Sequence, residues 1–321
     1  MELQTRLTLP HHPQPISYQG KVLLLGSCFA GHIGGKLSHY QFRNTLNPFG
    51  TLFQPRAIAN LLDRALTRRY FREEDCFYHR ERWHSHEVHS DLSNPAREEL
   101  IKTLNRRIEE TGELLSGISH LVITLGTAWG YIRKDNGQWV ANCHKVPQKE
   151  FEKVLASPDE ILKELRKALS DLFKINPGIS VIFTVSPVRH SKDGFVENQR
   201  SKSHLFVALH QLLEEFEDRG VFYFPAYELL MDELRDYRFY EADMLHPNTL
   251  AVDYIWERFR ESCIIPADEP VMTRVGEIRR GMQHRPFYPD SLEYKTFKAD
   301  LAEKIKDLKK EYPFMTFGSG L

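Results

Sequence analysis

Four short apolar segments, separated by stretches with helical periodicity, limit the folds open to this chain more than any other feature of its sequence. The segments cover residues 21–25, 120–125, 180–185 and 221–224. A short apolar run that ends at a turn residue is typical of a strand buried on both faces. Strands that alternate with helices form βαβ units, so we predict an α/β fold built on a mainly parallel sheet.

The segments between and after these strands have the spacing of amphipathic helices. Apolar side chains recur at helical intervals over residues 29–37, 53–70, 97–116, 158–174, 201–218 and 249–262. From about residue 264 the pattern changes, and a strongly charged stretch over 291–311 predicts one more helix. We therefore expect an α/β domain over residues 1–263. A C-terminal helical extension over residues 264–321 would pack on this domain or contact a partner.

Charge and cysteine content argue against several classes of function. The 321 residues carry 43 basic and 44 acidic side chains, a net charge of −1, so no basic field favours nucleic acid or a membrane surface. No apolar stretch approaches the roughly 18 residues of a spanning helix, and residues 1–6 do not resemble a signal peptide. The four cysteines lie apart, without a CxxC pair. We expect a cytoplasmic protein without disulfides, nucleic-acid partner or membrane span, and the sequence leaves its oligomeric state open.

Polar residues follow three of the predicted strands. Ser27 follows the first strand and Thr127 the second, while Ser186 and Arg189 follow the third. The carboxyl ends of parallel strands meet at one edge of the sheet, where such folds bind ligands. A serine hydroxyl at the start of a helix lies beside free backbone N–H groups, which favour a developing oxyanion. A serine at this position also commonly caps the helix, so Ser27 is either a nucleophile or a cap.

Asp243 and His246 form a D-x-x-H sequence just before the last helix of the predicted domain. A serine nucleophile needs a base that takes its proton, and the imidazole needs a partner that orients it. Side chains three residues apart on one turn can face the same site. We therefore interpret Ser27, His246 and Asp243 as nucleophile, base and orienting carboxylate.

Six short strings, in this order, resemble the SGNH (GDSL-like) hydrolase superfamily and, more closely, the GSCFA family, whose name is the first string. They stand at residues 26–30 (GSCFA), 47–50 (NPFG), 125–129 (LGTAW), 142–147 (NCHKVP), 186–190 (SPVRH) and 243–248 (DMLHPN). The resemblance covers roughly residues 20 to 260 and leaves out the C-terminal extension. It implies a three-layer α/β/α sandwich of the SGNH or flavodoxin-like kind.

The resemblance also implies roles for individual residues. Ser27 would be the nucleophile, His246 its base and Asp243 the carboxylate that orients the base. The backbone N–H groups of Ser27 and Gly50 would donate to the oxyanion hole.

The chain departs from the wider superfamily in two of its sequence blocks. The first block reads Gly-Ser-Cys where Gly-Asp-Ser is usual. The third block, usually Gly-x-Asn-Asp, reads Gly-Thr-Ala-Trp over residues 126–129, so the expected oxyanion asparagine is absent there. Thr127 or Asn142 would take its place.

Further polar side chains are candidates for the substrate site. They are His86, His89, Trp129, His144, Arg189, Asn198 and Lys202. The group of His84, His86, His89 and His144 offers an alternative as a metal site, because neutral imidazole is a ligand for zinc or iron. Cys28, which follows Ser27, is expected to pack into the core, since adjacent residues on a helix point apart.

The favoured function is a serine esterase or acyltransferase that needs no cofactor or metal. By family analogy, its substrate would be a small-molecule or saccharide acyl ester, such as an acylated carbohydrate or cell-envelope precursor. Two alternatives remain. One is a metal-dependent hydrolase built on the histidine group, and the other is a non-catalytic ligand-binding protein on the hydrolase scaffold.

Overall fold

A five-stranded sheet forms the centre of the protein, whose structure is a computed structural model that describes residues 4–318. The strands are β1 (Val22–Gly26), β2 (Asn44–Leu46), β5 (His120–Leu125), β9 (Ser180–Val185) and β10 (Val221–Tyr223), in the spatial order β10-β9-β5-β1-β2. Every pairing between them is parallel. The predicted α/β fold with a parallel sheet is therefore confirmed.

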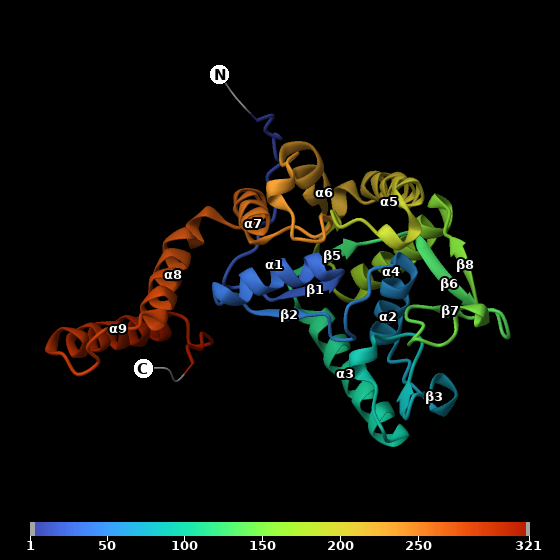
Figure 1. Cartoon of the computed structure of the whole chain (residues 1–321), viewed down its shortest axis with the longest axis horizontal. Helices are drawn as coiled ribbons and strands as arrows, with labels where there is room; N and C mark the ends of the chain where they lie inside the picture. Colours follow the sequence, from blue (N-terminus) through green and yellow to red (C-terminus); the bar gives the residue numbers. More distant parts are fainter. Residues whose placement is uncertain (1–3, 319–321) are drawn as a thin grey trace.

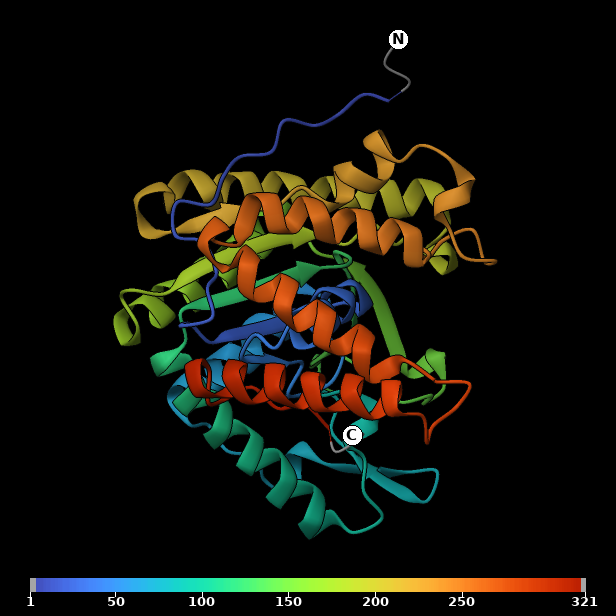
Figure 2. The same cartoon turned by 90° about the vertical axis from the view of Figure 1, so that its left-hand side faces the viewer.

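Helices cover both faces of this sheet, as Figures 1 and 2 show. Strand side chains point alternately to the two faces. The helices are α1 (Cys28–His39), α2 (Pro55–Thr67), α3 (Arg97–Gly117), α4 (Pro158–Ile175), α5 (Phe195–Glu215), α6 (Ala226–Glu228) and α7 (Thr249–Cys263). Leu23 and Leu25 pack with α2, α4 and α5, whereas Val22 and Leu24 pack with α1 and α7. The result is the expected three-layer sandwich.

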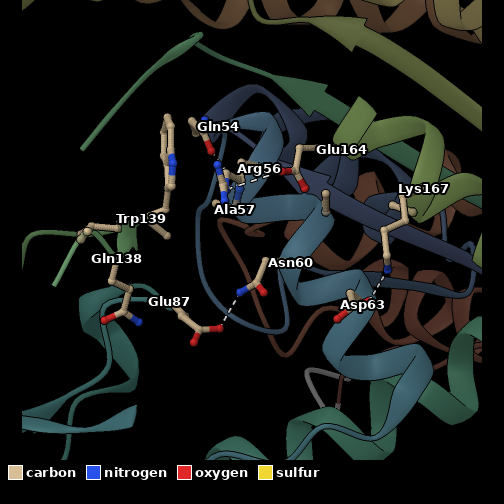
Figure 3. A pocket seen from close by; sticks show the side chains of 15 residues that line it. Gln54, Arg56, Ala57, Asn60, Asp63, Glu87, Gln138, Trp139, Glu164 and Lys167 are labelled. Carbon is tan, nitrogen blue, oxygen red and sulfur yellow. Dashed lines mark hydrogen bonds and ion pairs between the residues drawn. The ribbon is translucent and has the colours of Figure 1, made fainter. Parts of the chain in front are cut away.

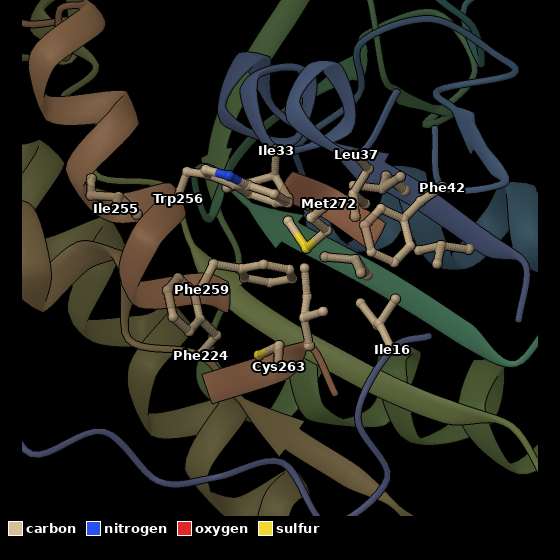
Figure 4. Packing of buried hydrophobic residues seen from close by; sticks show 14 of the residues in the cluster. Ile16, Ile33, Leu37, Phe42, Phe224, Ile255, Trp256, Phe259, Cys263 and Met272 are labelled. Atoms are coloured by element: carbon tan, nitrogen blue, oxygen red, sulfur yellow. The ribbon is translucent and has the colours of Figure 1, made fainter. Parts of the chain in front are cut away.

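The C-terminal helices share the core beneath α1. They are α8 (Glu269–Gln283) and α9 (Leu292–Glu311). Met272 of α8 lies among buried side chains of α1 and α7 in Figure 4, and Leu301 and Leu308 of α9 belong to the same cluster. The sequence predicted α9 but not α8, whose buried residues alternate with charged ones. The C-terminal stretch is thus joined to the domain by apolar packing.

The sequence analysis did not predict two small antiparallel sheets. One contains β6 (Trp129–Arg133), β7 (Trp139–Val140) and β8 (Phe151–Leu155), in the order β7-β6-β8, and the other pairs β3 (Phe77–His79) with β4 (Arg82–His84). Their strands are short and carry many polar residues, so they lack the continuous apolar run of a buried strand. The first of these sheets follows β5 directly and lies beyond its carboxyl end.

Within residues 4–318, no helix combines the length and apolar character that crossing a membrane requires. Each of the four cysteines is a free thiol.

Candidate active site

Ser27 lies at a sharp turn between β1 and α1. Gly26 has φ 133°, and a Cβ atom at this position would come within 2.3 Å of the Thr124 carbonyl oxygen, so the turn requires glycine. Ser27 is the N-cap of α1, and its Oγ accepts a hydrogen bond from the Phe29 N–H at 3.2 Å. The side chain therefore caps the helix while its own hydroxyl proton stays available for donation.

The segment 47–50 holds this turn from the side. Asn47 Oδ1 accepts the Gly26 N–H at 2.9 Å, and Asn47 Nδ2 donates to the Gly26 carbonyl at 3.3 Å. The Gly50 N–H donates to the Asn47 carbonyl at 2.8 Å and so closes a turn. Gly50 has φ 78°, and a Cβ there would lie 2.2 Å from His89 Cβ. The string Asn-Pro-Phe-Gly thus positions the serine turn, and its glycine N–H is engaged within the segment.

Asp243 and His246 form the pair that the D-x-x-H spacing predicts. His246 Nδ1 lies 2.6 Å from Asp243 Oδ2, and Asp243 Oδ1 accepts the N–H groups of Leu245 and His246, each at 2.9 Å. The hydrogen bonds from the His246 backbone and side chain, and then from the Leu245 N–H, lower the pKa of Asp243 to about 2. The carboxylate is therefore ionised near neutral pH, where it can accept a hydrogen bond from a protonated His246 Nδ1, the tautomer that leaves a free lone pair on Nε2.

The charge of His246 affects one group on α1 and another on the loop after β9. In the part of the chain that the structure describes, no hydrogen bond joins His246 to Ser27. Burial, followed by the charge of His246, lowers the pKa of His32 on α1. Burial, and then the nearby charges of Lys202 and His246 among others, lowers the pKa of His190 after β9 to about 4. His246 thus lies near both α1 and the end of β9. Catalytic hydrogen bonds are often long before substrate binds.

Thr127 and Asn142, the two candidates for the missing oxyanion residue, both make hydrogen bonds elsewhere. Thr127 Oγ1 lies 2.8 Å from Ser201 Oγ and accepts the Trp129 N–H at 3.1 Å. Asn142 Oδ1 accepts the His144 N–H at 2.9 Å. Among residues 4–318, neither side chain is hydrogen-bonded to Ser27. The assignment of either residue to the oxyanion hole stays a prediction.

Three of the four candidate metal ligands gather around Phe77. The His86 ring stacks on Phe77 at 4.0 Å between centroids, and the rings of His84 and His144 are 4.6 Å apart. Each of the three rings uses one nitrogen on a backbone carbonyl, at 3.1, 3.0 and 2.7 Å for His84, His86 and His144. Burial lowers the pKa of both His86 and His144 to about 4, so these rings are neutral.

This histidine group does not have the geometry of a metal site. Across residues 4–318, no cluster of three or more His, Cys, Asp or Glu side chains could hold a metal ion. His89 is directed elsewhere, with Nδ1 3.1 Å from a carboxylate oxygen of Asp91. The group instead packs and bonds the loop 142–147 against the hairpin β3–β4, which is a structural role.

The remaining substrate-site candidates lie around the carboxyl end of β9. Lys202 is fully buried and donates to two backbone carbonyls. Asn198 Oδ1 accepts the His190 N–H at 3.0 Å. Trp129 donates its indole N–H to the Glu197 carbonyl at 3.2 Å. Arg189 lies near enough to Lys202 for its charge to affect the pKa of that lysine. These residues therefore cluster near one edge, but most of their polar groups are already used within the protein.

Cys28 and His190 depart from the sequence analysis. The Cys28 side chain is exposed rather than packed into the core, whereas the next two residues of α1, Phe29 and Ala30, are buried. Desolvation by the surrounding protein raises the pKa of the Cys28 thiol, which disfavours a thiolate nucleophile. The sequence analysis did not select His190. Its position at the end of the string Ser-Pro-Val-Arg-His, after a buried strand, was the available signal.

A cavity of about 440 Å³ lies between α2, α4 and β7 (Figure 3). Gln54 is one of the residues that line the cavity. The residue before it, Phe53, accepts the Gly126 N–H on its carbonyl at 2.7 Å. Trp139 forms one wall, and the guanidinium group of Arg56 lies 4.7 Å from its ring. One lining residue is thus next in sequence to a residue that is hydrogen-bonded to the carboxyl end of β5. Ser27 is not among the residues that line the cavity.

Comparison with known proteins gives two family matches and a distant likeness to solved structures. The model described as the GSCFA family matches residues 21–259, and the model of the GSCFA domain protein, C-terminal domain, matches residues 275–319. A solved acetyl xylan esterase from the rumen bacterium Butyrivibrio proteoclasticus is similar with a TM-score of 0.31 and 12% identity. The match covers 77% of this chain but only 65% of that one. No curated protein matches this chain.

Proposed function

This chain belongs to the GSCFA family, and from that premise we propose that it is a serine hydrolase of the SGNH type that acts on acyl esters. The carrying observation is the 2.6 Å contact between Asp243 and His246, together with Ser27 at the N-terminus of α1, just after the end of β1. An ionised carboxylate that fixes an imidazole tautomer is the arrangement that activates a serine hydroxyl.

In the proposed reaction, His246 Nε2 removes the Ser27 hydroxyl proton as Ser27 Oγ attacks the ester carbonyl carbon. The new Oγ–acyl bond forms, the ester C–O bond breaks, and His246 returns the proton to the leaving alcohol. Water, or a second hydroxyl, then attacks the acyl-enzyme by the same route and restores Ser27. Asp243 stabilises the imidazolium throughout without taking its proton.

The N-terminus of α1 is the main oxyanion stabiliser in this proposal. Its first N–H groups and the helix dipole favour negative charge next to Ser27. Gly50 is a weaker candidate, because its N–H already donates to the Asn47 carbonyl. Asn142 would have to donate through Nδ2, since its Oδ1 accepts the His144 N–H. Because the third-block asparagine is absent, the N-terminus of α1 would provide a larger share of the stabilisation of the oxyanion.

We propose an acylated carbohydrate as the substrate class, and the cavity beside α2 supports this. The charges in its wall are compensated within the protein, as Lys167 bonds Asp63 at 2.6 Å and Arg56 lies 3.6 Å from Glu164. A charged ligand would disturb these pairs, whereas a neutral polyhydroxyl ligand would not. Gln54 Nε2 is buried without a hydrogen-bond acceptor among the described residues. Solvent does not reach this donor, so the Gln54 side chain would have to turn toward the cavity, where a sugar hydroxyl would supply the acceptor and remove the cost of an unpaired donor.

Substituting Gln54→Glu tests the substrate class. The variant keeps the Oε1 that accepts the Ala57 N–H at 2.8 Å, but it loses the unpaired donor. We expect the ratio of kcat/KM for an acetylated oligosaccharide to kcat/KM for p-nitrophenyl acetate to fall about tenfold, the worth of one hydrogen bond of ~1.4 kcal/mol.

The exposed Gln211→Glu on α5 is the matched control, and Ser27→Ala supplies the background rate for both esters. An unchanged ratio in Gln54→Glu would show that the cavity takes no part in substrate binding. Absence of turnover of either ester by the wild type would instead count against the esterase itself.

A further inference from the structure

Lys202 is a fully buried cation at the carboxyl edge of the sheet. Its Nζ donates to the carbonyls of Gly126 and Ser186, each at 2.6 Å. Gly126 follows β5 and Ser186 follows β9, and these two strands are neighbours in the sheet. Within residues 4–318 no carboxylate forms an ion pair with it. The ammonium group therefore bridges the ends of two adjacent strands with backbone partners alone.

Such a group opposes folding when it is charged. Burial, followed by the charge of Arg189, lowers the pKa of Lys202 to about 7. An apolar side chain of similar size would fill the same space without the desolvation penalty. Groups with strongly shifted pKa values concentrate at functional sites, because a residue that serves function can be retained although it lowers the stability of the fold.

Lys202 also belongs to a buried polar stripe on one face of α5. Asn198, Ser201 and Lys202 are spaced i, i+3 and i+4, and each is at least 98% buried. Ser201 Oγ accepts the Ala128 N–H at 2.7 Å, and Asn198 Oδ1 accepts the His190 N–H. The stripe thus holds both loops that leave β5 and β9 toward the site.

We propose that Lys202, in its ammonium form, is a positioning residue that clamps the ends of β5 and β9 and so fixes the loops 126–129 and 186–190 beside Ser27. The consequence for catalysis rests on the proposed esterase function, whereas the clamp itself does not. Charge-assisted hydrogen bonds are shorter and stronger than neutral ones, so loss of the proton loosens both loops together.

The surroundings of Lys202 define how this clamp responds to pH. The titratable and charged groups that face it are Cys28 of α1, Arg189 and His190 of the loop after β9, and Tyr227 of α6, whose ring centroid is 6.0 Å from Nζ. The positive charge of Arg189 favours proton loss from Lys202. The clamp therefore weakens as pH rises above about 7.

Hydrogen exchange of the wild type and Lys202→Met tests the clamp without requiring activity. Methionine matches lysine in length but cannot donate to the carbonyls. We expect amide exchange in peptides covering residues 126–129 and 186–190 to become faster in the variant at about pH 6, with the remaining sheet unchanged. The exposed Lys174→Met on α4 is the control. Unchanged exchange in both loops would overturn the proposal.

The reactivity of Ser27 toward a fluorophosphonate probe gives the second readout, which a purely structural lysine would not affect. The wild-type labelling rate constant should fall about tenfold between about pH 7 and pH 9. Lys202→Met should react about 10²-fold more slowly and lack this alkaline fall. Wild-type rates in a folded Lys202→Met would overturn the proposal. A wild type that resists the probe would contradict the esterase function and leave the exchange result to decide the clamp.

Discussion

His246→Ala is expected to lower kcat/KM for p-nitrophenyl acetate by about 10³- to 10⁴-fold. The imidazole is the base of the proposed reaction, and its 2.6 Å contact with Asp243 is shorter than the 3.1 Å contact of His89 with Asp91. Its side chain is 45% exposed, so the free energy of unfolding should change by only about 0.5 kcal/mol. The substitution therefore separates a chemical loss from a folding loss.

Asp243→Asn refines this test, since asparagine keeps an oxygen that can accept the N–H groups of Leu245 and His246. It cannot stabilise an imidazolium by charge or fix the required tautomer, so we again expect a loss of about 10²- to 10⁴-fold. His210→Ala, at an exposed position on α5, is the control and should retain wild-type kinetics. Full activity in His246→Ala would remove this residue from the mechanism.

Arg64→Ala should produce the largest loss of stability, about 3–5 kcal/mol of unfolding free energy. Arg64 is 2% exposed, and its Nε and Nη2 atoms each lie 2.6 Å from a carboxylate oxygen of Glu87. Nη2 also donates to Asp75 at 3.1 Å, and the guanidinium lies 4.1 Å from the Phe71 ring. Truncation leaves the Glu87 carboxylate, whose side chain is only 11% exposed, without its cation, and this makes the loss large.

Urea unfolding followed by circular dichroism measures this effect, with Arg69→Ala as the matched control. Arg69 follows the end of α2, the helix that carries Arg64, and contacts Asp63 at 3.3 Å, but its side chain is 45% exposed. Its removal should cost less than about 1 kcal/mol, as exposed ion pairs usually do. Equal losses for the two arginines would show that burial does not determine the strength of the Arg64 network.

Local patterns in the sequence were sufficient to predict the main strands of the sheet and the Asp243–His246 pair of the candidate site. Continuous apolar runs marked β1, β5 and β9 because strands buried on both faces have no polar positions. The Asp243–His246 contact followed from spacing alone, since the two residues share one turn. By contrast, β2 is only three residues long and partly exposed, so no local pattern distinguishes it from a loop.

The contacts between distant segments could not be derived in the same way. His84, His86 and His144 gather because the loop after β7 folds back on the hairpin β3–β4, and their nitrogens bond to backbone carbonyls whose positions no motif encodes. Lys202 was predicted as a substrate contact from its place after a strand. Its partners are the carbonyls of Gly126 and Ser186, which only the tertiary structure brings together.

The most direct test of the account is fluorophosphonate labelling of the intact protein, with the modified residue identified by peptide mass spectrometry. The account predicts one labelled residue, Ser27, and loss of labelling in a folded Ser27→Ala. Cys28→Ser, which changes the neighbouring exposed side chain, should still be labelled at Ser27. Labelling at another residue, or undiminished labelling of Ser27→Ala, would contradict the claim that Ser27 is the nucleophile.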